Sequence, residues 1–140
     1  FYDWKNLLGG TEAARNQFPF AVIIYISEVD DSQSICSGAI ISNSFIVSAA
    51  HCFIEMYTAD VLAGVHNVEL EYPDYELTIG PLDVIIHENY DQIRHYNDIA
   101  IIRVSRKPLT FGVSIQPIAI IPRSMVNSNL TGTIARVSGW

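Results

Sequence analysis

The chain has 140 residues, of which 49% are hydrophobic and 16% are charged, and its formal net charge is −7. This balance is typical of one ordered globular domain and excludes an intrinsically disordered chain. An acidic protein repels a phosphate backbone, so we expect no nucleic-acid partner. The apolar runs, such as residues 20–26 and 99–102, are far shorter than the roughly 20 residues that span a bilayer, so no membrane partner is expected either.

Short runs rich in isoleucine and valine recur between turn signals, and this pattern predicts an all-β domain. In chain order, the expected strands are residues 20–29, 34–41, 45–48, 60–64, 75–79, 82–87 and 98–104. A short helical turn is expected only within residues 49–57. Six or seven strands without long helices must bury their apolar faces in a closed barrel or a sandwich.

The pattern changes after Thr110. Residues 111–130 contain Gly112, Pro117 and Pro122, followed by a polar stretch, which predicts a segment that crosses a surface. A strand-like pattern returns at residues 133–137.

The two cysteines, Cys36 and Cys52, favour one disulfide, because no other residue nearby has the spacing of a metal ligand. Such a bond would contribute about 3 kcal/mol in the chain-entropy model. Two buried free thiols are the alternative. Asn129-Leu130-Thr131 is a glycosylation acceptor pattern, and with a disulfide it indicates a secreted, extracellular protein. We expect no metal site and no cofactor.

A histidine and an aspartate stand beside apolar runs. His51 follows one run and Asp98 precedes another. Imidazole suits proton transfer near neutral pH, and a carboxylate that accepts its ring N–H would fix its tautomer. Taken alone, such a pair more often consists of surface or capping residues.

Ordered motifs around these residues resemble the trypsin/chymotrypsin-like serine proteases. The resemblance covers residues 7–140 and rests on seven segments: Leu7-Leu8-Gly9-Gly10, Phe18-Pro19-Phe20, Cys36-Ser37-Gly38-Ala39-Ile40-Ile41, Ser48-Ala49-Ala50-His51-Cys52, Asn97-Asp98-Ile99-Ala100-Ile101-Ile102, Gln116-Pro117-Ile118 and Val137-Ser138-Gly139-Trp140.

The resemblance implies the fold and the domain organisation. The family has two six-stranded antiparallel barrels with the active site between them. This chain is then expected to be all-β and to supply a Greek-key barrel (residues 7–110), followed by a connector and the start of the second barrel (residues 111–140). Residues 1–6 would be a remnant of a propeptide or linker.

The resemblance also implies roles for site residues. His51 would be the general base and later the general acid, and Asp98 would be its orienting partner. The backbone amides of Ala50 and His51 would bind the Asp98 carboxylate. Cys36–Cys52 would be the disulfide beside this histidine.

The sequence departs from the family because it contains no Gly-Asp-Ser-Gly-Gly motif. Ser48 and Ser138 are expected to have structural roles. We therefore expect a serine endopeptidase, present as an inactive fragment that lacks the nucleophilic serine, with protein or peptide substrates and the second barrel of the same parent chain as partners. The alternative is a non-catalytic protease homologue that acts as a binding or regulatory module.

Overall fold

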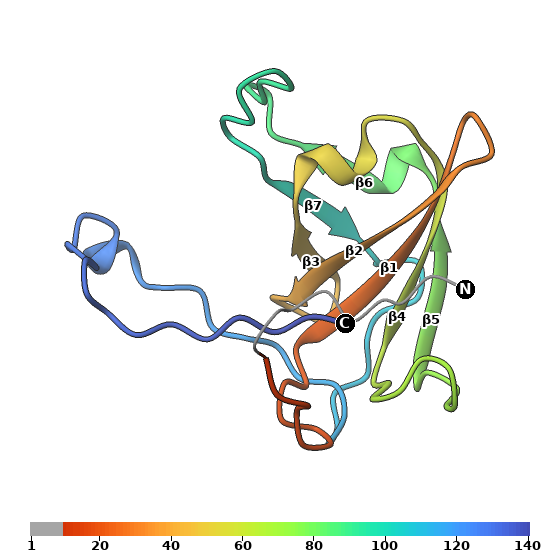
Figure 1. Cartoon of the computed structure of the whole chain (residues 1–140), viewed down its shortest axis with the longest axis horizontal. Helices are drawn as coiled ribbons and strands as arrows, with labels where there is room; N and C mark the ends of the chain where they lie inside the picture. The colour runs from red at the N-terminus through yellow and green to blue at the C-terminus, as the bar shows by residue number, and fades with distance from the viewer. Residues whose placement is uncertain (1–9) are drawn as a thin grey trace.

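The structure is a computed structural model that describes residues 10–140. These residues form one curled antiparallel sheet with the strand order β5-β4-β1-β2-β3-β7-β6 (Figure 1). The strands are β1 (Ala21–Glu28), β2 (Gln33–Ile40), β3 (Phe45–Ser48), β4 (Met56–Ala63), β5 (Tyr75–Ile79), β6 (Val84–Ile86) and β7 (Ala100–Arg103). The sequence-based prediction of an all-β antiparallel fold is confirmed.

The core lies inside the curl of the sheet. β1 is rich in β-branched residues, which favour a pleated strand, and it pairs with both β2 and β4. Ile24 of β1, Ile46 of β3 and Ile102 of β7 are fully buried in one cluster. Among residues 10–140, no polar or charged residue is buried. The polar side chains of this part of the chain are therefore at least partly exposed, on an apolar scaffold.

A corner between the two edge strands gives the sheet seven strands instead of the six that the resemblance implies. Gly80 and Pro81 follow β5, and proline has no N–H for a ladder. The chain therefore leaves β5 through a 3-10 turn, η2 (Pro81–Asp83), before β6 pairs with β7. Arg106 binds the carboxylate of Asp83 at 2.6 Å, which fastens this corner to the segment after β7.

Two further boundaries differ from the prediction by more than two residues. The helical turn is shorter than expected, η1 (Ala50–Phe53), and β4 begins at Met56 instead of residue 60. The reason is that Met56 pairs with Glu28 and that the Val29 amide donates to the Glu55 carbonyl at 3.1 Å. The longer ladder with β1 thus extends β4 toward the turn.

The segment after β7 crosses the surface as predicted, but it contains no strand at residues 133–137. Its first part is tied to the barrel, because the Ile118 amide donates to the Ile40 carbonyl at 2.8 Å. The segment then extends away from the sheet, forms a short turn, η3 (Arg123–Met125), and runs back toward the sheet (Figure 1). Ile134 is 95% exposed, so the expected strand has no neighbour to pair with in the described residues.

The helical segments in residues 10–140 are 3-10 turns of three or four residues. None of them has the length or the apolar content to cross a membrane.

Two glycines give a matched test of this packing. A Cβ at Gly38 in β2 would lie 2.8 Å from Ile46 Cγ2 and 2.9 Å from Val22 Cγ2, whereas a Cβ at Gly80 would meet nothing within 4 Å. We expect Gly38→Ala to lower the free energy of unfolding by about 1–3 kcal/mol through overpacking. Gly80→Ala should change it by less than about 1 kcal/mol. Urea unfolding of both variants measures the difference, and equal losses would contradict this packing.

Candidate active site

His51 lies on η1, immediately after the end of β3. Its neighbours on the turn, Ala50 and Phe53, are buried at 0% and 5% exposure and anchor the turn in the core. The His51 side chain is instead 53% exposed. Because two apolar side chains of a short turn point inward, the imidazole between them is presented to solvent.

The pairing of two strands brings Asp98 to this histidine. β3 runs antiparallel to β7, with Ser48 opposite Ala100. Asp98, two residues before β7, therefore lies beside the turn that follows β3. Asp98 and His51, which are 47 positions apart, meet there.

Asp98 holds His51 with both carboxylate oxygens. The His51 backbone amide donates to Asp98 Oδ1 at 2.8 Å, and His51 Nδ1 lies 2.8 Å from Asp98 Oδ2. An ionised carboxylate only accepts hydrogen bonds, so the ring proton belongs on Nδ1 and the lone pair on Nε2. The predicted contact between Asp98 and the His51 amide is thus confirmed.

The environment keeps Asp98 ionised. Partial burial acts to raise the pKa of its carboxyl group, but the hydrogen bonds from the His51 amide and ring, helped by the Ala50 amide, outweigh burial and lower this pKa below its usual value. The carboxylate therefore stays negative over the range in which a histidine gains and loses its proton.

Asn97 fixes the backbone directly before Asp98, a role that was not predicted from the sequence. Its backbone is left-handed, with φ of 56°, a conformation that asparagine tolerates better than most residues. Its side-chain amide donates to the Asn89 carbonyl at 2.8 Å, and its own carbonyl accepts the Ile99 amide at 2.8 Å. The signal in the sequence was an asparagine directly before the candidate aspartate.

The loop that contains Asn89 and Asn97 also brings a second histidine to the site. His95 is exposed, and its ring lies 6.4 Å from the His51 ring in an edge-to-face arrangement. The hydroxyl of Tyr90 lies 3.4 Å from His95 Nδ1. One side of His51 is therefore bordered by this loop.

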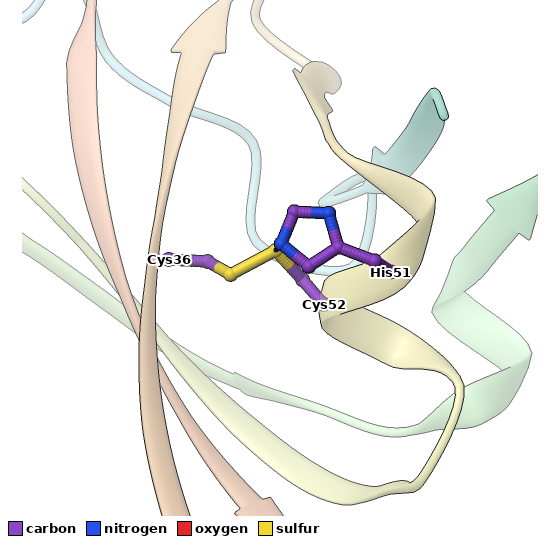
Figure 2. Close-up of side chains that lie close together, drawn as sticks. All are labelled: Cys36, His51 and Cys52. Atoms are coloured by element: carbon purple, nitrogen blue, oxygen red, sulfur yellow. Dashed lines mark hydrogen bonds between the residues drawn. A yellow bond between two sulfur atoms is a disulfide. The ribbon is translucent and has the colours of Figure 1, made fainter. Parts of the chain in front are cut away.

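The predicted disulfide is present between Cys36 of β2 and Cys52 of η1, with their Cα atoms 6.4 Å apart, and the free-thiol alternative is wrong. Figure 2 shows the His51 ring beside this bond, with Cys52 Sγ at 3.6 Å from His51 Nε2. The three side chains cluster within 4.8 Å. Sulfurs joined in a disulfide are not thiolates, so they do not bind zinc, and the two cysteines form a covalent cross-link.

The other predicted residues lie apart from this pair. The Ser48 hydroxyl donates to the Ser37 carbonyl at 2.9 Å, a structural role. Ser138 makes no hydrogen bond with the His51 ring, whose Nδ1 binds Asp98 and whose Nε2 lies near Cys52 Sγ. Asn129 is exposed on the segment after the barrel, where its side-chain oxygen accepts the Thr131 amide at 2.9 Å; its glycosylation stays a prediction.

Known proteins share this sequence pattern and this fold. Residues 7–140 match the model of the Trypsin family. Coagulation factor IX of Cavia porcellus is 32% identical over 140 residues, which are 99% of this chain and 47% of the relative. Brachyurin of Leptuca pugilator is 34% identical over 134 residues, which are 96% of this chain and 55% of the relative.

Solved structures share the fold. The HL collagenase structure superposes with a TM-score of 0.75 at 23% identity and covers 86% of this chain and 50% of that one. The chain spans about half the length of the curated relatives it matches. The family match covers residues 7–140, and this range includes the motifs around His51 and Asp98. The chain belongs to the trypsin family, the trypsin/chymotrypsin-like serine proteases.

Proposed function

We propose that the protein is a serine endopeptidase that hydrolyses peptide bonds in protein or peptide substrates, with His51 and Asp98 as two of its three catalytic residues. One observation carries this proposal. Both oxygens of Asp98 are engaged by His51, through its backbone amide and through Nδ1. This arrangement fixes the tautomer and leaves the lone pair on the basic nitrogen Nε2.

The proposed mechanism follows from these atoms. His51 Nε2 takes the proton of a serine hydroxyl as the oxygen attacks the peptide carbonyl. The imidazolium then formed is stabilised by the negative Asp98, whose pKa lies below its usual value. When the tetrahedral intermediate collapses, Nε2 gives this proton to the leaving amine. A water molecule, activated in the same way, releases the acyl group.

We propose that the nucleophile belongs to another part of the same parent protein. In residues 10–140, no serine hydroxyl is bonded to the His51 ring, and the chain spans about half the length of its relatives. Residues 7–110 would be the first barrel and residues 111–140 the connector to a second barrel with the serine and the oxyanion hole. These 140 residues would then be inactive alone. Residues 1–6, the proposed remnant of a propeptide or linker, lie outside the described residues.

Exposed apolar side chains on the connector support a second barrel as its partner. Ile120, Ile134 and Val137 are 68%, 95% and 81% exposed. A barrel packed against this segment would remove that surface from water.

We also propose that the protein is secreted. The Cys36–Cys52 disulfide supports this, because such bonds persist in oxidising compartments. The exposed Asn129 in its acceptor pattern would then be open to glycosylation.

A serine-directed fluorophosphonate tests the proposed activity. Full-length protein should be labelled on one serine, and His51→Ala should reduce the labelling rate by more than about 100-fold, because the base that activates the hydroxyl is lost. His66→Ala is the matched control, since His66 lies beyond the far end of β4, where its ring is 3.4 Å from Glu12, and this variant should label like the native protein. Full-length native protein that does not label would contradict the proposal and support a non-catalytic homologue.

The lowered pKa of Asp98 predicts how its contribution to stability depends on pH. A carboxyl group with a depressed folded pKa stabilises the fold above its unfolded pKa, near 3.9, and this contribution is lost as the pH falls through the folded value. Asp98→Asn should therefore lower the free energy of unfolding by roughly 1–2 kcal/mol at pH 6, with the difference shrinking below about pH 4.

Denaturant unfolding of the full-length protein between pH 3 and pH 6 measures this difference. The exposed Asp31 offers a matched control, and Asp31→Asn should cost less than about 0.5 kcal/mol at pH 6. An Asp98→Asn penalty that grows as the pH falls would contradict the assignment.

A further inference from the structure

A groove of about 360 Å³ opens beside His51. Cys36 and Cys52 line it next to the imidazole, Ile35 and Ile54 add apolar wall, and Glu28 and Glu55 contribute carboxylates. We refer to this groove as the leaving-group groove, because it lies where the leaving peptide would pass His51.

The chemistry of His51 determines which part of a substrate this groove would receive. Nε2 must give its proton to the leaving amine, so the residues after the scissile bond pass beside Nε2. Cys52 Sγ lies 3.6 Å from Nε2 and also lines the groove. Figure 2 shows the ring and the disulfide side by side. The groove therefore begins where the leaving peptide begins.

The strand register gives the distance along β1 between the position opposite Cys36 and Glu28. Cys36 is opposite Ile24 on β1, and Glu28 is four residues farther along that strand. At about 3.3 Å per residue, this separation is roughly 13 Å. A lysine or arginine side chain covers part of this distance, so the second or third residue after the scissile bond is the one that can bring a charged group to Glu28.

The carboxylates of Glu28 and Glu55 make the groove negatively charged. Its lining contains no lysine or arginine. In residues 10–140, neither carboxylate takes part in any of the ion pairs, which join other residues. Their backbones are held together, because Glu28 pairs across the sheet with Met56 and the Val29 amide donates to the Glu55 carbonyl at 3.1 Å. The sheet therefore keeps the two acidic residues next to each other.

We propose that the leaving-group groove selects substrates with lysine or arginine at the second or third position after the scissile bond, and that Glu28 and Glu55 are the specificity-determining residues. This inference rests on the proposed endopeptidase function. The aliphatic stem of the basic side chain packs on Ile35 and Ile54, and its cationic end lies between the two carboxylates. Acidic residues at the same positions are disfavoured by repulsion.

Cleavage of matched peptides tests the proposal on full-length protein. Internally quenched peptides would be identical up to the scissile bond and have two arginines, two alanines or two glutamates at the second and third positions after it. The native protein should have a kcat/KM for the arginine peptide roughly threefold to tenfold above that for the alanine peptide, and the glutamate peptide should be the slowest.

Glu28→Gln combined with Glu55→Gln should bring the arginine-to-alanine ratio below about two. The control pair Glu69→Gln with Glu76→Gln removes two exposed carboxylates outside this groove, and it should keep the native ratio. A native ratio near one, or a ratio that survives in the double variant, overturns the proposal while leaving the peptidase function intact.

A binding measurement separates this inference from the proposed activity. Ala-Arg-Arg-amide mimics a leaving peptide, and calorimetry or NMR titration should show that native full-length protein binds it at least threefold more tightly than Ala-Ala-Ala-amide, with the preference lost in the Glu28→Gln, Glu55→Gln variant. A protein that cleaves no peptide but shows this preference contradicts the peptidase function alone. Equal affinities for the two amides overturn the groove proposal.

Discussion

The antiparallel pairing of β3 with β7 is the constraint on which the site depends. Ser48 lies opposite Ala100. The turn after β3, which contains His51, and Asp98, which precedes β7, therefore lie at the same end of the sheet. The buried Ile46 and Ile102 pair in the same ladder and fix its register. A shift by one residue would turn these side chains out of the core, so apolar packing fixes where His51 and Asp98 meet. The disulfide then holds η1 to β2 on the other side of the imidazole.

Much of this arrangement could be predicted from the sequence. The alternation and β-branched content of the strands predict β1 to β3 almost to the residue, and the motifs around His51, Asp98 and the cysteines predict which side chains come together. The start of β4 was missed because it depends on cross-strand pairing of Met56 with Glu28, a partner distant in sequence. The strand expected at residues 133–137 failed for the same reason, since a strand pattern is not sufficient without a neighbour.

Contacts that depend on loop conformation could not be predicted from the local sequence pattern. The left-handed Asn97 and its bond to Asn89 need the loop between β6 and β7 to fold back on itself. The approach of His95 to His51 depends on the same loop. Likewise, Glu28 and Glu55 become neighbours only through the sheet. In each case the chemistry of the residue was visible in the sequence, whereas its partner was fixed by tertiary contacts.

The central claim is that Asp98 holds the His51 ring with its proton on Nδ1 and its lone pair on Nε2. Nitrogen-15 NMR of the imidazole in full-length protein, at a pH where His51 is neutral, tests this claim most directly. The account predicts a protonated-type shift for Nδ1, an unprotonated-type shift for Nε2, and loss of this pattern in Asp98→Asn. A ring with its proton on Nε2, or a pattern that Asp98→Asn leaves unchanged, would contradict it.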